Sequence, residues 1–569
     1  MQLPTRILDL HTHLFNARYL PLASVISHAM GRDSSPLARQ VARLLQALTG
    51  SAYADVPIEA VFSASAGDGQ DAQDIRELEC LEHLWRMVEY ELLQSTGSLD
   101  AVEQGLSPQL EQSLQAPVFD RLRASQFMDI LLGLEQIDYA QEGWSGAPQP
   151  GAPQPGPRTV GAPQPGPHAA GAPQPGAPQP GPPQPGPPSE LPLSINPLAR
   201  ERGTSEAAFA PALPRPEVAG TFPDFLHWAE RVVRKALWVV TRLMDPTAWG
   251  DAANYPAFFL TLLHSEEQLL QKLFASYGQG LPPLQAVHYL MDMQMAFPGQ
   301  EAPYYPLQPV QEDRMQALQR AHPARVFGFS AFDPRRADWH ARALHALGKG
   351  FAGFKFYPAM GYKPVGNEPA IQARIDDFLD FCVARGLPVF AHCTPVGFQT
   401  RFRLGGYAHP RHWREVLEQP RWQGLRLCLG HAGGGRLDNG ALHSPGWLAR
   451  SEEEWRHEDN FARIASELCT AHPNVYCEVA YLAQLMQDDG FARFEANLRR
   501  ARQDAASAGR PYELLEKMAY GSDWHMPDVI TRTRRYLDLF LEWMDQPEYA
   551  PYREAFFWKN GYRYLRLPL

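Results

Sequence analysis

Short apolar runs that alternate with segments of helical periodicity fill the second half of the chain. Between most of these runs, apolar residues recur at three- and four-residue spacing, as in 370–385, which is typical of amphipathic helices. Strands that are apolar on both faces and alternate with helices indicate a parallel α/β sheet. With an earlier run at 7–13, the pattern supplies eight strands, the number that closes a (β/α)8 TIM barrel. The later seven runs lie at 285–292, 325–332, 352–357, 388–392, 425–431, 474–479 and 518–523.

A long segment with a different pattern separates the first apolar run from the second. Around Trp85, apolar residues recur as on one face of a helix, and similar patterns follow at 225–244 and 258–274. We therefore expect residues 1–15 to form the first barrel strand, 16–284 a mostly helical insertion, and 285–569 the remainder of the barrel. Because the insertion follows a strand, it leaves the barrel on the face where such barrels carry their active sites. Its helices suit a lid over the site or a surface for a homodimer.

The insertion contains a linker rich in Pro, Gly and Gln at 146–215. Within it, residues 146–188 form a near-pentapeptide repeat of the type GAPQP, and the repeat holds many of the chain's 53 Pro. A segment with almost no apolar side chains cannot offset its ordering entropy by burial. We expect this linker to be disordered.

Composition excludes several classes of partner. The chain of 569 residues has a net charge of −11, which argues against nucleic acid because phosphate binding needs a basic surface. No apolar run reaches the length needed to span a membrane. The six Cys are scattered without CxxC spacing, as expected for reduced thiols in a cytoplasmic protein. A small molecule is the expected partner.

Polar residues with metal-binding chemistry stand where four of the apolar runs stop. The first run, LDLHTHLF at 8–15, carries two histidines at spacing i and i+2, which on a regular strand share one face with Asp9. An isolated HxH is a weak signal, but PVFAHC, LCLGHAGG and AYGSDW repeat the arrangement at later strand ends. Histidines with a carboxylate match the ligand set of a catalytic divalent metal site. The residues are His11, His13, His392, His431 and Asp523.

Five segments of the chain, taken together, resemble a known family. The segments LDLHTH, GFKFYP, PVFAHC, LGHAGG and GSDWHMP, in this order, are similar to the amidohydrolase superfamily, and in particular to its amidohydrolase-related branch. The resemblance covers 1–15 and about 285–569 and leaves the insertion out. It implies a TIM barrel and a metal-dependent hydrolase, decarboxylase or hydratase.

The resemblance also implies roles for individual residues. His11, His13, His392 and Asp523 would bind one divalent ion, with Zn²⁺ expected first and Mn, Fe or Co compatible with the same ligands. His431 would orient or activate the water at the metal, and Asp523 would in addition accept its proton.

Lys355, in GFKFYP, fits two roles. In binuclear members of the superfamily a lysine on the fourth strand is carbamylated and bridges two metals, so a carbamylated Lys355 would imply two ions. In the related branch this lysine more often resembles a contact for a substrate anion, and one ion is therefore expected. Further substrate contacts are predicted for Tyr357, Arg401, Arg403 and His525. An ordinary loop position explains Tyr357 and His525 equally well, and solvated loop arginines are commoner than arginines that bind substrate. His409 and His412 are interpreted as structural.

Three functions remain open on the sequence alone. The first is a metal-dependent hydrolase that adds activated water to an amide, lactone or ester of a small, anionic substrate. The second is a non-oxidative decarboxylase or hydratase of an unsaturated or aromatic acid, which family resemblance does not separate from the first. The third is a non-catalytic barrel that uses the insertion as an interaction surface, although every ligand position holds a competent residue.

Overall fold

The computed structural model describes most of the barrel and much of the insertion. The described residues are 2–51, 80–91, 124–143, 222–243, 255–296, 302–398, 404–434, 444–487, 489–524, 526, 529 and 532–569. The linker predicted at 146–215 lies outside them.

Eight parallel strands form one sheet in which each strand pairs with the next along the chain. The first and last strands also meet: the amide of Leu10 donates to the carbonyl of Tyr520 (3.0 Å), and the amide of Asp523 donates to the carbonyl of His11 (2.8 Å). The predicted (β/α)8 TIM barrel is confirmed. The strands are β1 (Ile7–Thr12), β2 (Leu284–Tyr289), β3 (Val326–Phe332), β4 (Gly353–Phe356), β5 (Pro388–Ala391), β6 (Arg426–Leu429), β7 (Val475–Glu478) and β8 (Met518–Ala519).

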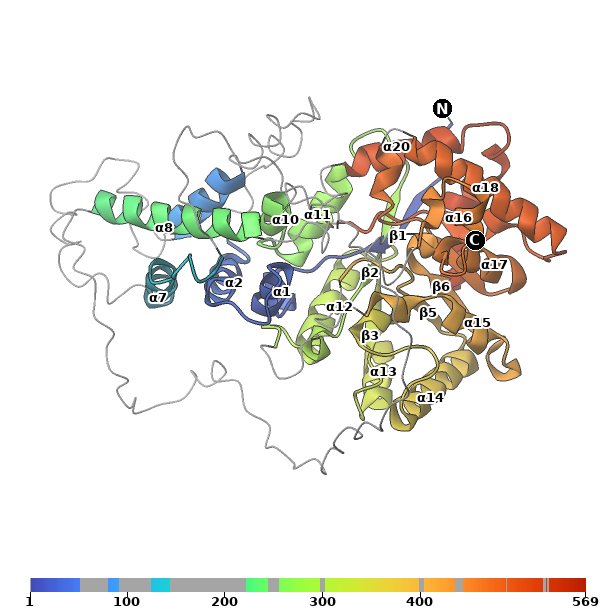
Figure 1. The fold of residues 1–569 in the computed structure, drawn as a ribbon, viewed down its shortest axis with the longest axis horizontal. Helices are drawn as coiled ribbons and strands as arrows, with labels where there is room; N and C mark the ends of the chain where they lie inside the picture. The colour runs from blue at the N-terminus through green and yellow to red at the C-terminus, as the bar shows by residue number, and fades with distance from the viewer. Residues whose placement is uncertain are drawn as a thin grey trace, which may run out of the picture. The chain divides into compact units, whose positions relative to one another are not determined.

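Helices follow the later strands and lie outside them (Figure 1). Local sequence sets their ends: α14 begins with Pro369 at its first turn and ends at Gly386, which adopts a left-handed conformation (φ 62°) that glycine tolerates. The helices are α12 (Glu312–Ala321), α13 (Trp339–Gly348), α14 (Pro369–Arg385), α15 (Arg411–Leu417), α16 (Glu452–Arg456), α17 (Phe461–Ala471), α18 (Gly490–Ser507), α20 (Thr533–Trp543) and α21 (Asn560–Leu565).

The inside of the barrel is a packed apolar core with α21 against it. At Gly561 of α21, a Cβ atom would come within 2.6 Å of Leu8 Cδ2, so glycine allows the helix to approach this side chain closely. The side-chain amide of Asn560 donates to the carbonyls of Leu515 and Met518, which ties α21 to β8. This core includes Leu8, Leu10, Val287, Tyr289, Phe329, Phe390, Cys428, Tyr476, Ala519, Tyr562 and Tyr564.

The pairing of β1 with β2 shifts register between Asp9 and Thr12, as in a β-bulge. The expectation that Asp9 shares a face with His11 is wrong for this reason, because an extra residue in one strand reverses the alternation that follows it. The ring of His11 contacts the inner Phe390 (ring centroids 4.6 Å apart). The carboxylate of Asp9 instead accepts from the hydroxyls of Ser522 and Tyr277, both at 2.5 Å.

All described residues between β1 and β2 form helices, turns or irregular segments, as predicted. The segment is joined to the barrel by a bidentate ion pair in which Arg314 of α12 donates twice to Glu266 of α11, each at 2.6 Å. The helices of the segment are α1 (Leu22–Ala29), α2 (Pro36–Leu48), a helix at 80–91, α7 (Ala124–Glu135), α8 (Phe222–Leu243), α10 (Tyr255–Thr261) and α11 (Glu266–Ser276).

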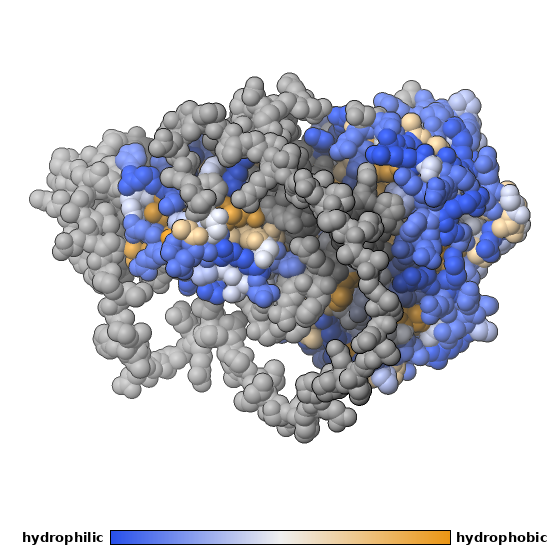
Figure 2. All heavy atoms as spheres, viewed as in Figure 1, coloured by the Kyte–Doolittle hydropathy of each residue, from blue (hydrophilic) through white to orange (hydrophobic). Residues whose placement is uncertain are grey.

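The surface is polar over the barrel helices near α16 and α18, where hydrophilic residues dominate the face shown in Figure 2. Within the described residues, no helix combines the length and the apolarity needed to cross a bilayer. All six cysteines are buried.

Candidate metal centre

Three of the four predicted metal ligands meet at the junction of β1 and β8. The Nε2 atoms of His11 and His13 are 3.2 Å apart, and Asp523 Oδ1 lies 3.3 Å and 3.2 Å from them. All three side chains are buried. Their ligand atoms lie within 4.8 Å of one another, a spacing that allows one ion to contact all three.

The hydrogen bonds of these residues fix which atoms carry lone pairs. His11 Nδ1 is 2.9 Å from Glu478 Oε1, and His13 Nδ1 is 3.2 Å from the carbonyl oxygen of Tyr289. Both neighbours are acceptors, so each Nδ1 carries the proton and each Nε2 is left with a lone pair. Asp523 Oδ1 is buried and receives no hydrogen bond. Three electron-rich atoms therefore face one another without a proton between them.

The other two predicted histidines form a second such pair. His431 Nδ1 lies 3.0 Å from the carbonyl oxygen of Ala480, and His392 Nε2 lies 2.9 Å from that of Val396. The remaining nitrogens, His431 Nε2 and His392 Nδ1, are 3.2 Å apart and both present lone pairs. The ring centroids of His431 and His11 are 5.0 Å apart, so the pair adjoins the first cluster.

Two site residues adopt left-handed backbone conformations that are unfavourable for residues other than glycine. The φ angle is 57° at His431 and 61° at Asp523. Such conformations cost about 1–3 kcal/mol each and persist only where the surroundings hold them. Here the amide of His431 donates to Glu478 Oε1 (2.7 Å), and that of Asp523 donates to the carbonyl of His11 (2.8 Å).

Burial keeps His11 and His431 neutral. Burial, together with the positive charge of Lys355, holds the pKa of His11 well below its usual value, and burial lowers the pKa of His431 to about 4. Burial alone would raise the pKa of Asp523, but its surroundings, which include the positive charge of Lys355, hold it below its usual value. Asp523 is thus an anionic carboxylate beside the neutral imidazoles of His11 and His431, the protonation state that metal binding requires.

Lys355 of β4 points into this centre. Its Nζ is 3.3 Å from His11 Nε2 and lies over the ring of Phe390, 4.1 Å from the centroid. Among the described residues, no carboxylate lies within hydrogen-bonding distance of this amine. Burial lowers the pKa of Lys355 to about 7.

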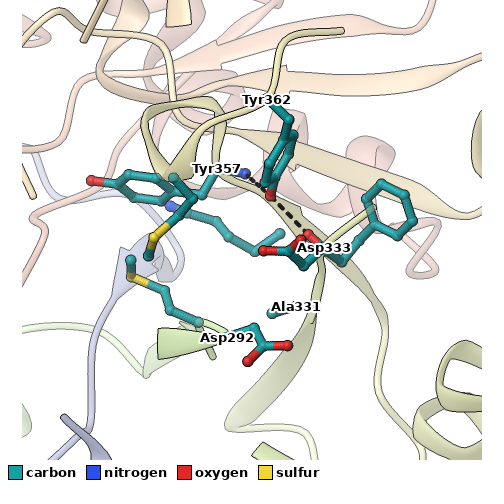
Figure 3. Close-up of a pocket in the computed structure, with 9 residues that line it drawn as sticks. Asp292, Ala331, Asp333, Tyr357 and Tyr362 are labelled. Carbon is teal, nitrogen blue, oxygen red and sulfur yellow. Dashed lines mark hydrogen bonds between the residues drawn. The ribbon is translucent and has the colours of Figure 1, made fainter. Parts of the chain in front are cut away.

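A small cavity adjoins Lys355, and Figure 3 shows Tyr357, Tyr362, Asp292 and Asp333 around it. The two carboxylates are already neutralised, since Arg336 donates to Asp292 and Arg335 to Asp333 through paired hydrogen bonds. Tyr362 is fixed by donating to the carbonyl of Phe332 (2.9 Å). The lining residues are Met291, Asp292, Ala331, Phe332, Asp333, Lys355, Tyr357, Met360 and Tyr362.

The remaining predicted site residues divide into two groups. Tyr357 lines the cavity and stacks on His392, with ring centroids 4.2 Å apart. Arg401, Arg403 and His525 lie outside the described residues.

Sequence reasoning missed Glu478, which ends β7 and contacts both His11 and His431. A signal is present in the sequence, because Glu478 is a lone carboxylate near the end of the apolar run at 474–479, as His392 is a polar residue at the end of its own run. Burial raises the pKa of Glu478 to about 8, although the amides of His431 and Ala480 act in the opposite direction.

The donor set fits a divalent ion. Imidazole nitrogens and a carboxylate oxygen suit Zn²⁺ and similar metals. Each histidine of the centre also donates its other ring N–H to a carbonyl or carboxylate, as metal-binding histidines almost always do. The unpaired Asp523 Oδ1 is the atom that such an ion would satisfy.

Comparison with known proteins gives one family and several structures. The amidohydrolase family model matches residues 273–567. An uncharacterized TIM-barrel protein from Bordetella bronchiseptica is 17% identical over 53% of this chain and 84% of its own, with a TM-score of 0.34. An amidohydrolase from Burkholderia multivorans with bound zinc is 18% identical over 56% and 95% (TM-score 0.33). A 5-carboxyvanillate decarboxylase from Novosphingobium aromaticivorans, complexed with manganese, is 16% identical over 53% and 84% (TM-score 0.34). The comparison with curated proteins gave no match.

Proposed function

Because this chain belongs to the amidohydrolase family, we propose that it is a metal-dependent hydrolase of a small, anionic substrate. The bond attacked by water would be an amide, a lactone or an ester. The observation that carries the proposal is the meeting of His11 Nε2, His13 Nε2 and Asp523 Oδ1, three buried atoms with lone pairs and no shared proton.

His11, His13 and Asp523 would hold the ion, with His392 as the fourth ligand, and Zn²⁺ is the ion we expect first. Bound there, a divalent ion supplies Lewis-acid activation of water and of the substrate's carbonyl oxygen.

The protein's own groups would bind the substrate and move the protons. His431 is neutral and its Nε2 carries a lone pair, so this atom can accept a proton from the attacking water and return it to the leaving group. Lys355 Nζ, which has no carboxylate partner among the described residues, would bind the anionic group of the substrate.

A second reaction is favoured by the lining of the cavity. Its wall includes Phe332, Tyr357 and Met360 beside Lys355, and this combination of apolar side chains with one amine matches the chemistry of an unsaturated acid. A non-oxidative decarboxylase of an aromatic or unsaturated acid would use the same centre.

Metal content tests the centre itself. We expect about one equivalent of Zn²⁺ or a similar ion per chain by plasma mass spectrometry after purification without chelator, and almost none in His11→Ala. His412→Gln, which changes a buried histidine outside the centre, should keep the metal. Two equivalents would indicate a carbamylated Lys355, and none in the wild type would contradict the proposal.

The reaction class can be tested on a panel of small carboxylates, esters and lactones. A hydrolase incorporates ¹⁸O from labelled water into its acid product, whereas a decarboxylase releases CO₂ and incorporates no solvent oxygen. Release of CO₂ alone would replace the hydrolase proposal by the second reaction.

A further inference from the structure

The carboxylate of Glu478 stands behind the metal centre and joins two of its histidines. The residue ends β7, and its side chain is fully buried. Oε1 accepts from His11 Nδ1 (2.9 Å) and from the amide of His431 (2.7 Å), while Oε2 accepts from the amide of Ala480 (2.5 Å). Among the described residues, the hydrogen bonds that this carboxylate accepts thus all come from N–H groups.

The first of these contacts sets the tautomer of His11. Because Oε1 is an acceptor, the ring proton stays on Nδ1, and Nε2 faces His13 and Asp523 with its lone pair. A carboxylate that accepts from a metal-binding imidazole also fixes the orientation of the ring and raises the basicity of the opposite nitrogen.

The other two contacts place His431. The amide of His431 donates to the same Oε1, which holds the left-handed backbone of this residue in place. Ala480, whose amide binds Oε2, presents its carbonyl oxygen to His431 Nδ1 at 3.0 Å. One carboxylate therefore sets both the backbone and, through Ala480, the ring of His431.

The segment that follows β8 leaves room for the carboxylate of Glu478. A Cβ atom at Gly521 would lie 2.6 Å from Glu478 Oε2 and 3.1 Å from His11 Cβ. The absence of a side chain at Gly521 thus keeps the space that Glu478 and His11 share.

We propose that Glu478 is a positioning residue of the metal centre. It strengthens metal binding by orienting and polarising His11, and it aligns His431 for proton transfer, without itself touching the ion. This role rests on the proposed function, since it concerns the same centre.

Zn²⁺ affinity, measured by competition with a chromophoric chelator, tests the role without any substrate. In Glu478→Gln, the amide oxygen can still accept from His11 and His431, but its NH₂ group then faces the N–H of Ala480, and the negative charge is lost. We expect the affinity for Zn²⁺ to fall about 10- to 100-fold. The Co²⁺-substituted variant should also show shifted visible absorption bands, because the donor strength of His11 changes.

Glu312→Gln is the matched control. Glu312 is also a fully buried carboxylate that accepts hydrogen bonds, from Ser330 Oγ (2.6 Å) and Gln308 Nε2 (2.9 Å), but its partners are not in the centre. This variant should lose thermal stability and keep wild-type affinity for Zn²⁺. A merely structural role for Glu478 would give the same result in Glu478→Gln.

The outcomes separate this inference from the proposed function. Wild-type affinity and unchanged Co²⁺ bands in Glu478→Gln overturn the positioning role while the metal centre stands. If the wild type itself binds no Zn²⁺, the proposed function fails first. Should Glu478→Gln not fold, Gly521→Ala takes its place, because it crowds Glu478 and leaves every polar group present. Unchanged Zn²⁺ affinity in Gly521→Ala would then refute the role.

Discussion

At the scale of single residues, the candidate metal centre depends on the hydrogen-bond acceptor that each histidine contacts with its second ring nitrogen. Four histidines each present one ring nitrogen to an acceptor and keep the other for the site. The acceptors are Glu478 and the carbonyl oxygens of Tyr289, Ala480 and Val396. The sequence could predict the residue types, because histidines and an aspartate stand where apolar runs stop. It could not predict the tautomers, since three of the four acceptors come from other strands or the loops after them.

His409 is a buried histidine outside the centre, and it should make the protein sensitive to acid. Burial lowers its pKa to about 3. Between about pH 6.5 and 3, His409 therefore binds a proton in the unfolded chain but not in the folded protein. The free energy of unfolding should therefore fall by about 1.4 kcal/mol per pH unit as pH drops from 6.5 towards 3. Urea unfolding of wild type and His409→Gln across this range measures the difference. Parallel pH profiles for the two proteins would contradict the assignment.

At the scale of elements, the eight apolar runs predicted the strands to within a few residues, because strands buried on both faces are apolar throughout. The faces of β1 were harder to predict. The register shift between Asp9 and Thr12 turns Asp9 away from His11, and it depends on pairing with β2, which no local pattern reveals. The shift leaves Asp9 to receive donors from Ser522, after β8, and from Tyr277, which follows α11.

Tyr277→Phe should destabilise the protein by about 1.5–3 kcal/mol, because it removes a hydrogen bond to a buried carboxylate. Chemical unfolding measures the change. Tyr564→Phe is the matched control, since the Tyr564 hydroxyl is buried without a hydrogen-bond partner among the described residues and its loss should cost little. Equal losses in both variants would show that the bond to Asp9 contributes nothing.

At the scale of the whole molecule, the fold brings together candidate metal ligands from the first and the last part of the barrel. His11 and His13 lie in and directly after β1, and Asp523 follows β8. The sequence predicted this arrangement through the barrel, because the ends of parallel strands meet at one rim. It could not predict the substrate, since the cavity is lined from the ends of β2, β3 and β4, and its shape depends on how Met291, Tyr357 and Met360 pack.

Removal of the metal should lower the thermal stability of the whole barrel. An ion held by β1 and by the segment after β8 binds only the folded protein, so it stabilises by about 4 kcal/mol at a thousandfold excess over its Kd. We expect a chelator to lower the Tm of the wild type by several degrees in differential scanning calorimetry and to leave His11→Ala unchanged. An equal shift in both would point to metal bound elsewhere.

The pairing of β1 with the segment after β8 has a consequence for how the protein is made. Asp9 and its partner Ser522 are 513 positions apart in the chain. At about 5 to 20 residues per second, the ribosome needs on the order of a minute between synthesising the two. Throughout that time, the nascent β1 has none of its late partners, and His11 and His13 have no Asp523. Under the proposed function, the complete set of metal ligands therefore exists only late in the maturation of the chain.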